Sequence, residues 1–256
     1  MLTFNYHTHT RRCRHAQGTE RDYIETAIAA GMKTLGFSDH APQLFPGDYY
    51  SDYRMFPEET EDYAMTLAAL REEYKDRIDI RIGYEAEYYP DIFPALLEHL
   101  KKYPCDYLIL GQHFLDNETT RRYSGRWNED EQYLADYVDQ VCAGIRTGCF
   151  TYAAHPELQN YVGEREVYRR QYSRLIRCAM ENGVPLEINL LGLAGGRHYP
   201  NDIFWELAGE MGATAVIGCD AHQPEALADL GAVKAAEALA ERYGLRLTEP
   251  VLRAPF

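Results

Sequence analysis

The chain has 256 residues, of which 46% are hydrophobic and 12% aromatic, and its formal net charge is -14. This length and hydrophobic content allow one large domain with a substantial core. The acidic balance argues against binding of long nucleic acids, which depends on neutralising phosphates, although a local basic spot could hold one small phosphate.

Segments with the periodicity of strands and of helices alternate along the chain. In chain order, strands are predicted at residues 2–9, 34–39, 78–87, 106–112, 150–154, 185–190 and 214–219. Helices are predicted between and after them, at about residues 19–30, 58–74, 92–102, 129–146, 166–182, 201–211 and 224–243. The longer loops are expected at residues 41–57, 116–128 and 191–199.

Seven strands alternating with helices indicate an α/β fold with a parallel sheet. This length favours closure of the sheet into a TIM-like (β/α)7 barrel, with an open doubly wound sheet as the alternative. No glycine-rich dinucleotide fingerprint follows the first strand, which argues against a Rossmann domain. No linker divides the chain, so residues 1–256 are expected to form a single domain.

The first predicted strand carries two histidines near its end. Side chains alternate along a strand, so His7 and His9 should point to one side, with Leu2, Phe4 and Tyr6 on the other, towards a hydrophobic layer. Two adjacent imidazoles make a ready pair of metal ligands, although a His-x-His pattern alone is a weak signal.

Most other histidines and several acidic residues also fall at the C-terminal ends of predicted strands. Active sites of parallel α/β barrels lie at this end, and converging His, Asp and Glu side chains are the usual pattern of metal ligands. A metal site is therefore predicted there. The candidates are His7, His9, His15, His40, Glu85, Glu87, His113, His155, Asp220 and His222.

Small residues stand two positions before several of these candidates. A hollow beneath the candidate ligands, with room for several ions, is the expected consequence, because large branched residues normally fill a barrel axis. The small residues are Ser38, Gly83, Gly111, Ala153 and Gly218.

The six cysteines contain no C-x-x-C pair, which indicates reduced thiols. Cys13 lies close to the histidine-rich start and could be a ligand, although the nearby histidines suffice for an ordinary site. No secretory leader is recognisable, and no apolar run is long enough to span a bilayer. A cytoplasmic protein without a membrane partner is expected.

Four motifs make the whole chain resemble the PHP (polymerase and histidinol phosphatase) superfamily. They are His7-Thr8-His9, Ser38-Asp39-His40, His155-Pro156-Glu157 and Asp220-Ala221-His222, with Glu85 and His113 between them. Within the superfamily, the chain looks most similar to the histidinol-phosphatase branch. The segments Leu186-Glu187-Ile188-Asn189 and Gly196-Arg197-His198-Tyr199-Pro200 give further support to that branch.

The resemblance implies a distorted seven-stranded barrel with two or three divalent ions, for which Mn, Fe and Zn all accept such mixed ligands. Every ligand position of the family carries a suitable residue here. The resemblance implies one ion held by His7, His9, Glu85 and Asp220, a second by Glu85, His113 and His155, and a third by His15, His40 and His222.

The reaction implied is hydrolysis of a small phosphate ester, with L-histidinol phosphate of histidine biosynthesis as the favoured substrate. Arg197 is the predicted phosphate ligand, because its guanidinium fork matches phosphate and a pair of glycines precedes it. Arg11, Arg12 and Arg14 compete for that role. Either Asp220 or His222 is expected to protonate the leaving group. Candidate contacts for the rest of the substrate are Asp48, Tyr49, Tyr50 and Asp52.

Other functions stay open. A different PHP hydrolase could act as a nucleoside phosphodiesterase, a 3′-5′ nuclease or a phosphotyrosine phosphatase. A non-catalytic metal-binding protein is the alternative from another class. A metal-dependent amide hydrolase is disfavoured, because no lysine at a strand end could form a carbamylated bridge; Lys33 precedes its strand.

Overall fold

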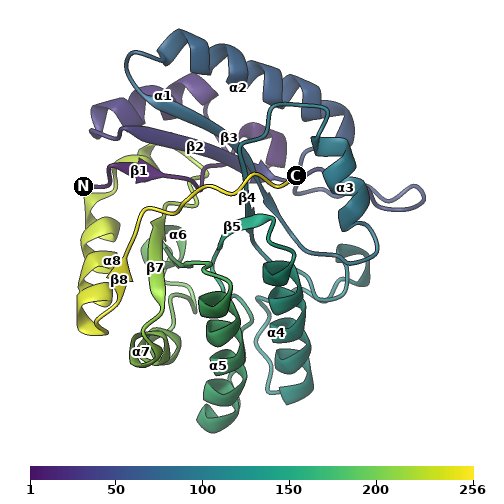
Figure 1. Cartoon of the computed structure of the whole chain (residues 1–256), viewed down its shortest axis with the longest axis vertical. Helices are drawn as coiled ribbons and strands as arrows, with labels where there is room; N and C mark the ends of the chain where they lie inside the picture. The colour runs from purple at the N-terminus through teal and green to yellow at the C-terminus, as the bar shows by residue number, and fades with distance from the viewer.

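The computed structural model describes residues 1–256, and its centre is one curled sheet of parallel strands (Figure 1). Eight strands pair in sequence order, and all neighbours run parallel. They are β1 (Phe4–Asn5), β2 (Thr34–His40), β3 (Asp79–Ala86), β4 (Tyr107–Leu110), β5 (Phe150–Ala153), β6 (Leu186–Asn189), β7 (Thr214–Gly218) and β8 (Arg246–Leu247).

Helices connect the strands and surround the outside of the curled sheet (Figure 1). The α-helices are α1 (Glu20–Ala29), α2 (Thr60–Tyr74), α3 (Phe93–Leu100), α4 (Glu131–Arg146), α5 (Arg165–Glu181), α6 (Leu190–Ala194), α7 (Asp202–Met211) and α8 (Leu230–Arg242). Short 3-10 turns are η1 (Arg11–Cys13), η2 (Pro57–Glu59), η3 (Glu118–Thr120) and η4 (Pro224–Ala228). None of the helices combines the length and apolarity needed to cross a bilayer.

The two ends of the curled sheet meet at the site end of the barrel. A parallel bridge joins Thr8 to Ala221, and the backbone N–H of His9 donates to the Ala221 carbonyl at 2.9 Å. The TIM-like α/β fold predicted from the sequence is thus confirmed. The barrel is distorted, because β1 is short and β5 and β6 share only the register pair Ala153 and Leu186. The two-residue strand β8 on the outer side of β7 was not predicted.

Two hydrophobic clusters lie on the two faces of the sheet. The larger one, of 58 residues, fills the space between the sheet and the surrounding helices. The smaller one fills the barrel interior below the strand ends, where the Tyr107 hydroxyl donates to the backbone carbonyls of Tyr6 (2.8 Å) and Phe37 (3.1 Å). Its members are Tyr6, Tyr107, Ile109, Tyr152, Ala154 and Val216.

The alternation predicted for the first strand is wrong, because Phe4 and Tyr6 both pack with the cluster inside the barrel. The Asn5 amide donates to the His7 carbonyl at 3.1 Å and to the Thr8 hydroxyl at 2.7 Å, and its oxygen accepts from the His7 N–H at 3.3 Å. These side-chain bonds hold the backbone between β1 and the bridge from Thr8 to Ala221. Tyr6 points into the barrel interior, on the same side of the sheet as His7 and His9.

The hollow predicted beneath the ligands is also filled. A Cβ on Gly111 would overlap the carboxylate of Glu85, and one on Gly218 would overlap that of Glu187. Gly83 similarly lies under the ring of a tyrosine on the next strand. The glycines therefore make room for bulky side chains that cross the axis, and the space for ligands lies above them.

The C-terminal tail closes the opposite end of the barrel. Residues 248–256 follow β8 and run past the N-terminal ends of the strands (Figure 1). Leu252 packs against the interior cluster, and the backbone N–H of Arg253 donates to the Thr151 hydroxyl at 3.1 Å. The barrel therefore has a packed floor and is open only at the end that carries the histidines.

Two helical segments differ from the prediction because of local caps. The loop expected at residues 191–199 contains α6, whose first turn is capped by Asn189 through a bond from the Gly192 N–H of 2.9 Å. The helix expected at residues 224–243 is divided at Asp229, whose carboxylate caps α8 after η4.

Candidate active site

A cavity of about 550 Å³ opens above the C-terminal ends of the strands. Its lining includes candidate metal ligands, among them His40, His155 and Asp220. The remaining lining is mainly aromatic and aliphatic, with Arg197 and Asp52 as its other charged residues. A small molecule bound in this cavity would contact both the candidate metal ligands and the other lining residues.

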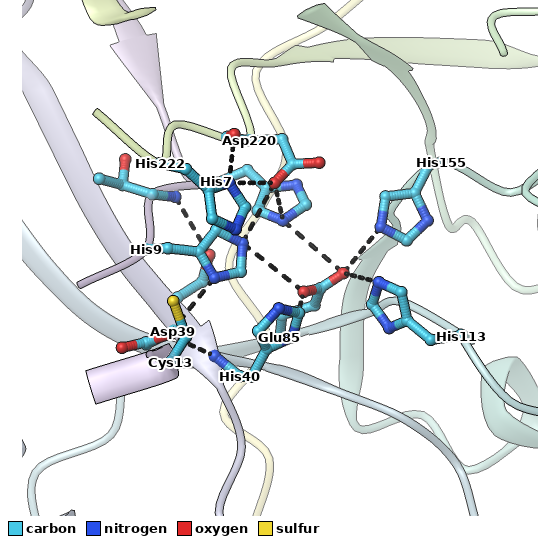
Figure 2. Close-up of polar contacts among 12 residues, drawn as sticks. His7, His9, Cys13, Asp39, His40, Glu85, His113, His155, Asp220 and His222 are labelled. Carbon is cyan, nitrogen blue, oxygen red and sulfur yellow. Dashed lines mark hydrogen bonds and ion pairs between the residues drawn. The ribbon is translucent and has the colours of Figure 1, made fainter. Parts of the chain in front are cut away.

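Glu85, near the end of β3, lies at the centre of the predicted ligands (Figure 2). Its side chain is almost fully buried, and five imidazoles surround it. Burial would raise the pKa of this carboxyl, but the imidazoles hold it well below its usual range. The distances from its oxygens are 2.8 Å to His155 Nε2, 2.9 Å to His40 Nδ1, 3.6 Å to His9 Nε2, and 3.7 Å each to His7 Nε2 and His113 Nε2.

Asp220 is the second anionic group of the centre. Its Oδ1 lies 3.2 Å from His9 Nε2 and 3.5 Å from His7 Nε2, so the same two histidines face both carboxylates. Against the effect of burial, His7, His9 and His222 hold the pKa of Asp220 well below its usual range. The centre thus places two ionised carboxylates among imidazole nitrogens.

His7 and His9 are oriented by carboxylates behind them. His7 Nδ1 lies 2.8 Å from Glu187 Oε1, and His9 Nδ1 lies 3.3 Å from Asp39 Oδ1. A carboxylate accepts, so each Nδ1 carries a hydrogen and each Nε2 faces the centre. Both Nε2 atoms are buried without a hydrogen-bond partner. Burial disfavours a charged ring, yet the carboxylates raise the pKa of His7 to about 10, so the centre strongly favours positive charge there.

His15 and His222 form a second pair of nitrogen donors at the site. Their Nε2 atoms face each other at 2.9 Å, while His15 Nδ1 lies 2.7 Å from the Cys13 carbonyl and His222 Nδ1 lies 3.0 Å from the Asp220 carbonyl. Carbonyls only accept, so both Nδ1 atoms carry hydrogens and two lone pairs oppose each other. A cation between the two nitrogens removes this repulsion.

These donors fit divalent metal ions. Imidazole nitrogens and carboxylate oxygens are ligands that Zn, Fe and Mn accept, and here they are buried, oriented and partly unpartnered. Donor groups within 4.8 Å of one another include His7 with His9 and Asp220, His7 with Glu85 and His155, and His9 with His40 and His222. The structure thus brings the predicted ligands together, and their division among individual ions stays a prediction.

Among the predicted arginines, Arg197 lines the cavity and the others do not. Arg197 Nη1 donates to the Tyr199 hydroxyl at 2.7 Å. Arg12 forms ion pairs with the carboxylates of α1 and α2, and Arg14 pairs with Glu59, so both guanidinium groups are already neutralised. The role of Arg197 as a phosphate ligand stays a prediction with a suitable position.

Asp52 is the one residue of the four predicted substrate contacts that lines this cavity. Tyr49 and Tyr50 line a smaller, separate cavity, and the Tyr49 hydroxyl donates to Glu118 at 2.9 Å. His198 lies outside the lining, because its Nε2 donates to the Leu158 carbonyl at 2.8 Å.

Sequence reasoning missed the orienting roles of Asp39 and Glu187 and misplaced Glu87. Glu187 is wholly buried in the middle of β6, and a charged residue inside a short apolar strand was an available signal. Glu87 follows β3, and its carboxylate pairs with Arg54, accepts from the His113 backbone N–H at 3.1 Å and lies 3.3 Å from His113 Nδ1. Burial would raise the pKa of Glu87, but Arg54 lowers it to about 2.

We expect Glu187→Gln to lower metal affinity and kcat by about ten- to a hundredfold, which is the usual cost of losing a residue that orients a metal-binding histidine. The Glu187 carboxylate accepts from the His155 backbone N–H and from the Asn189 amide, both at 2.9 Å, besides orienting His7. Metal affinity measured by competition with a chelating dye checks this positioning role. Glu237→Gln, on the exposed face of α8, is the matched control. Unchanged metal affinity in Glu187→Gln would contradict the role.

Known proteins are similar to this chain in sequence and in fold. The profile of the PHP domain matches residues 5–190. A probable histidinol-phosphatase of Deinococcus radiodurans is 29% identical over 233 residues, covering 85% of each chain. The histidinol-phosphatase of Bacillus subtilis is 28% identical over 250 residues, covering 85% of this chain and 92% of that protein.

A solved structure supports the fold. The crystal structure of a Lactococcus lactis histidinol phosphate phosphatase, complexed with zinc, L-histidinol and phosphate, matches with a TM-score of 0.74 at 18% sequence identity. The match covers 98% of this chain and 97% of that chain. The profile match spans more than half of the sequence, and it includes the strand ends that carry His7, His40, Glu85, His113 and His155. The chain therefore belongs to the PHP domain family.

Proposed function

We propose that this protein is a metal-dependent phosphatase that hydrolyses L-histidinol phosphate to histidinol and inorganic phosphate. The observation that carries the proposal is a single cavity lined both by candidate metal ligands and by Arg197, Asp52 and aromatic rings. Relatives named as histidinol-phosphatases, matched over most of their length, support this substrate over other phosphate esters.

The candidate metal ligands would hold two or three divalent ions. Bound there, such ions supply the positive charge that acidifies a water molecule and stabilises the phosphoryl oxygens. The proposed sets are His7, His9, Glu85 and Asp220 for one ion, Glu85, His113 and His155 for a second, and His15, His40 and His222 for a third.

The other residues that line the cavity supply binding and orientation of the substrate. Arg197 donates from the rim to phosphoryl oxygens, and its bond to Tyr199 fixes the guanidinium plane. Asp52 accepts from the ammonium group of histidinol, and Phe114 and Tyr123 pack against its imidazole. This arrangement distinguishes a phosphate monoester whose alcohol carries an ammonium group from one whose alcohol is uncharged.

Asp220 and His222 are the two candidates for protonating the leaving alkoxide. Both line the cavity beside the predicted position of the phosphate. Asp220 also accepts from the Asn189 amide at 3.0 Å, which leaves its other oxygen towards the histidines. Their roles as acids stay predictions.

Phosphate release from a panel of esters tests the proposal. The protein, loaded with Mn, Fe or Zn, should turn over histidinol phosphate with a kcat/KM about a hundredfold or more above sugar, nucleoside and tyrosine phosphates, because a site shaped to bind one substrate's polar groups discriminates against analogues that lack them. A preference for bis(p-nitrophenyl) phosphate would favour a phosphodiesterase. Absence of turnover on every ester in metal-loaded protein would favour a non-catalytic metal-binding protein.

Arg197→Ala should lower kcat/KM for histidinol phosphate by about ten- to a hundredfold, as expected for the loss of a charged hydrogen bond of about 1.5–3 kcal/mol. Metal content should be unchanged, because Arg197 contacts no ligand among those named. Steady-state kinetics with Arg177→Ala as the control, an exposed arginine of α5, check this. Identical kinetics in the two variants would remove Arg197 from the binding site.

A further inference from the structure

Cys13 is buried in unusual surroundings. It is the last residue of η1, and none of its surface is exposed. Cys142, Cys178 and Cys219 are also buried, but they lie in the outer hydrophobic core. Cys13 belongs to neither hydrophobic cluster. Hydrophobic packing, the usual reason for burying a free thiol, therefore does not account for its position.

The neighbours of Cys13 are metal-binding side chains. Its sulfur lies beside His9 and His15, and Figure 2 shows it close to His9 and Asp39. The sulfur, a His15 nitrogen and a His222 nitrogen all lie within 4.8 Å of one another. The thiol is thus a third donor beside the facing imidazole nitrogens of His15 and His222.

The backbone that leads to Cys13 is fixed by side-chain contacts. The Thr10 side chain caps η1 by accepting from the Arg12 N–H at 3.4 Å, and its hydroxyl donates to Asp39. The Arg12 guanidinium is held by Glu20 in a buried ion pair. A donor held in this way does not have to be ordered when a cation binds.

We propose that Cys13 is a thiolate ligand of the divalent ion held by His15 and His222. On binding, the thiol proton leaves to solvent and a sulfur–metal bond forms. One sulfur among imidazole nitrogens favours Zn, Fe(II) or Co(II) over Mn at this position, because Mn prefers oxygen donors. This proposal depends on the metal centre of the proposed function. It predicts that one ion position selects Zn, Fe(II) or Co(II), a selectivity that His, Asp and Glu ligands alone do not produce.

Cobalt substitution tests the assignment by spectroscopy. The full-length protein, stripped of metal and titrated with Co(II), should develop a near-ultraviolet sulfur-to-cobalt charge-transfer band. Cys13→Ser should abolish the band and weaken zinc binding at one site by about tenfold or more. Loss of a direct ligand should cost at least as much as loss of a residue that only orients a ligand. Cys149→Ser, a partly exposed cysteine elsewhere, should retain the band.

Cadmium NMR of the unaltered protein gives an independent measurement if Cys13→Ser does not fold. A resonance far downfield of nitrogen- and oxygen-only sites supports the thiolate. The inference is overturned if bound cobalt gives no such band, if the band survives in Cys13→Ser, or if every cadmium resonance is typical of nitrogen and oxygen ligands. Hydrolysis of histidinol phosphate without a sulfur signal would refute the inference alone, whereas a sulfur signal without hydrolysis would refute the proposed function alone.

Discussion

Glu85→Gln is expected to lower kcat/KM by about a thousandfold or more and to reduce the metal content of the purified protein. Glutamine keeps the shape of the side chain but removes the charge that faces five imidazoles. Metal ions supply several kcal/mol of transition-state stabilisation, and about 4 kcal/mol corresponds to a thousandfold in rate. Elemental analysis and steady-state kinetics on the same sample measure both effects.

The control for this substitution is again Glu237→Gln, which removes the same charge from an exposed position on α8. Thermal unfolding of both variants separates a loss of metal from a loss of fold. If Glu85→Gln keeps its full metal content and activity, Glu85 is not the shared ligand, and the proposed arrangement of the ions fails.

Arg54→Met is expected to destabilise the fold by about 3–5 kcal/mol, the cost of leaving buried charges without their partner. Arg54 is only 2% exposed, and it pairs with Glu87 and, at 2.8 Å, with Glu118. It also donates to the Ala41 carbonyl at 3.1 Å, so it fixes the loop after β2. Tm should fall by about 10 °C for a chain of this size, as circular dichroism can measure.

Two further variants test whether charge causes this effect. Arg170→Met removes an exposed ion pair with Glu131 and should cost less than about 1 kcal/mol. Combining Arg54→Met with Glu87→Gln and Glu118→Gln removes every charge of the buried network and should recover much of the lost stability. A triple variant no more stable than Arg54→Met would show that packing, not charge, explains the loss.

The fold and the location of the site could be predicted because both follow from local patterns. Alternating strands and helices imply a parallel sheet, and such a sheet brings all C-terminal strand ends to one side. His40, Glu85, His113 and His155 therefore meet although they are far apart in sequence.

What could not be predicted depends on contacts between distant segments. The pairing of Arg54 with Glu118 joins two long loops, and no periodicity in either loop signals it. The partner of His7 is Glu187, which becomes visible only when strand register is known. The missing hollow has the same cause, because side chains from neighbouring strands occupy the space above the glycines.

The sealed floor of the barrel has a consequence for how molecules enter and leave. The interior cluster and the C-terminal tail fill the barrel along its axis, so the substrate enters and both products leave through the same opening of the cavity. In the proposed reaction, the phosphate lies against the metal ligands at the bottom of the cavity, and the alcohol lies nearer its opening. The alcohol must therefore leave first. Phosphate that stays bound prevents the next substrate from binding, so the turnover rate depends on the phosphate concentration in solution.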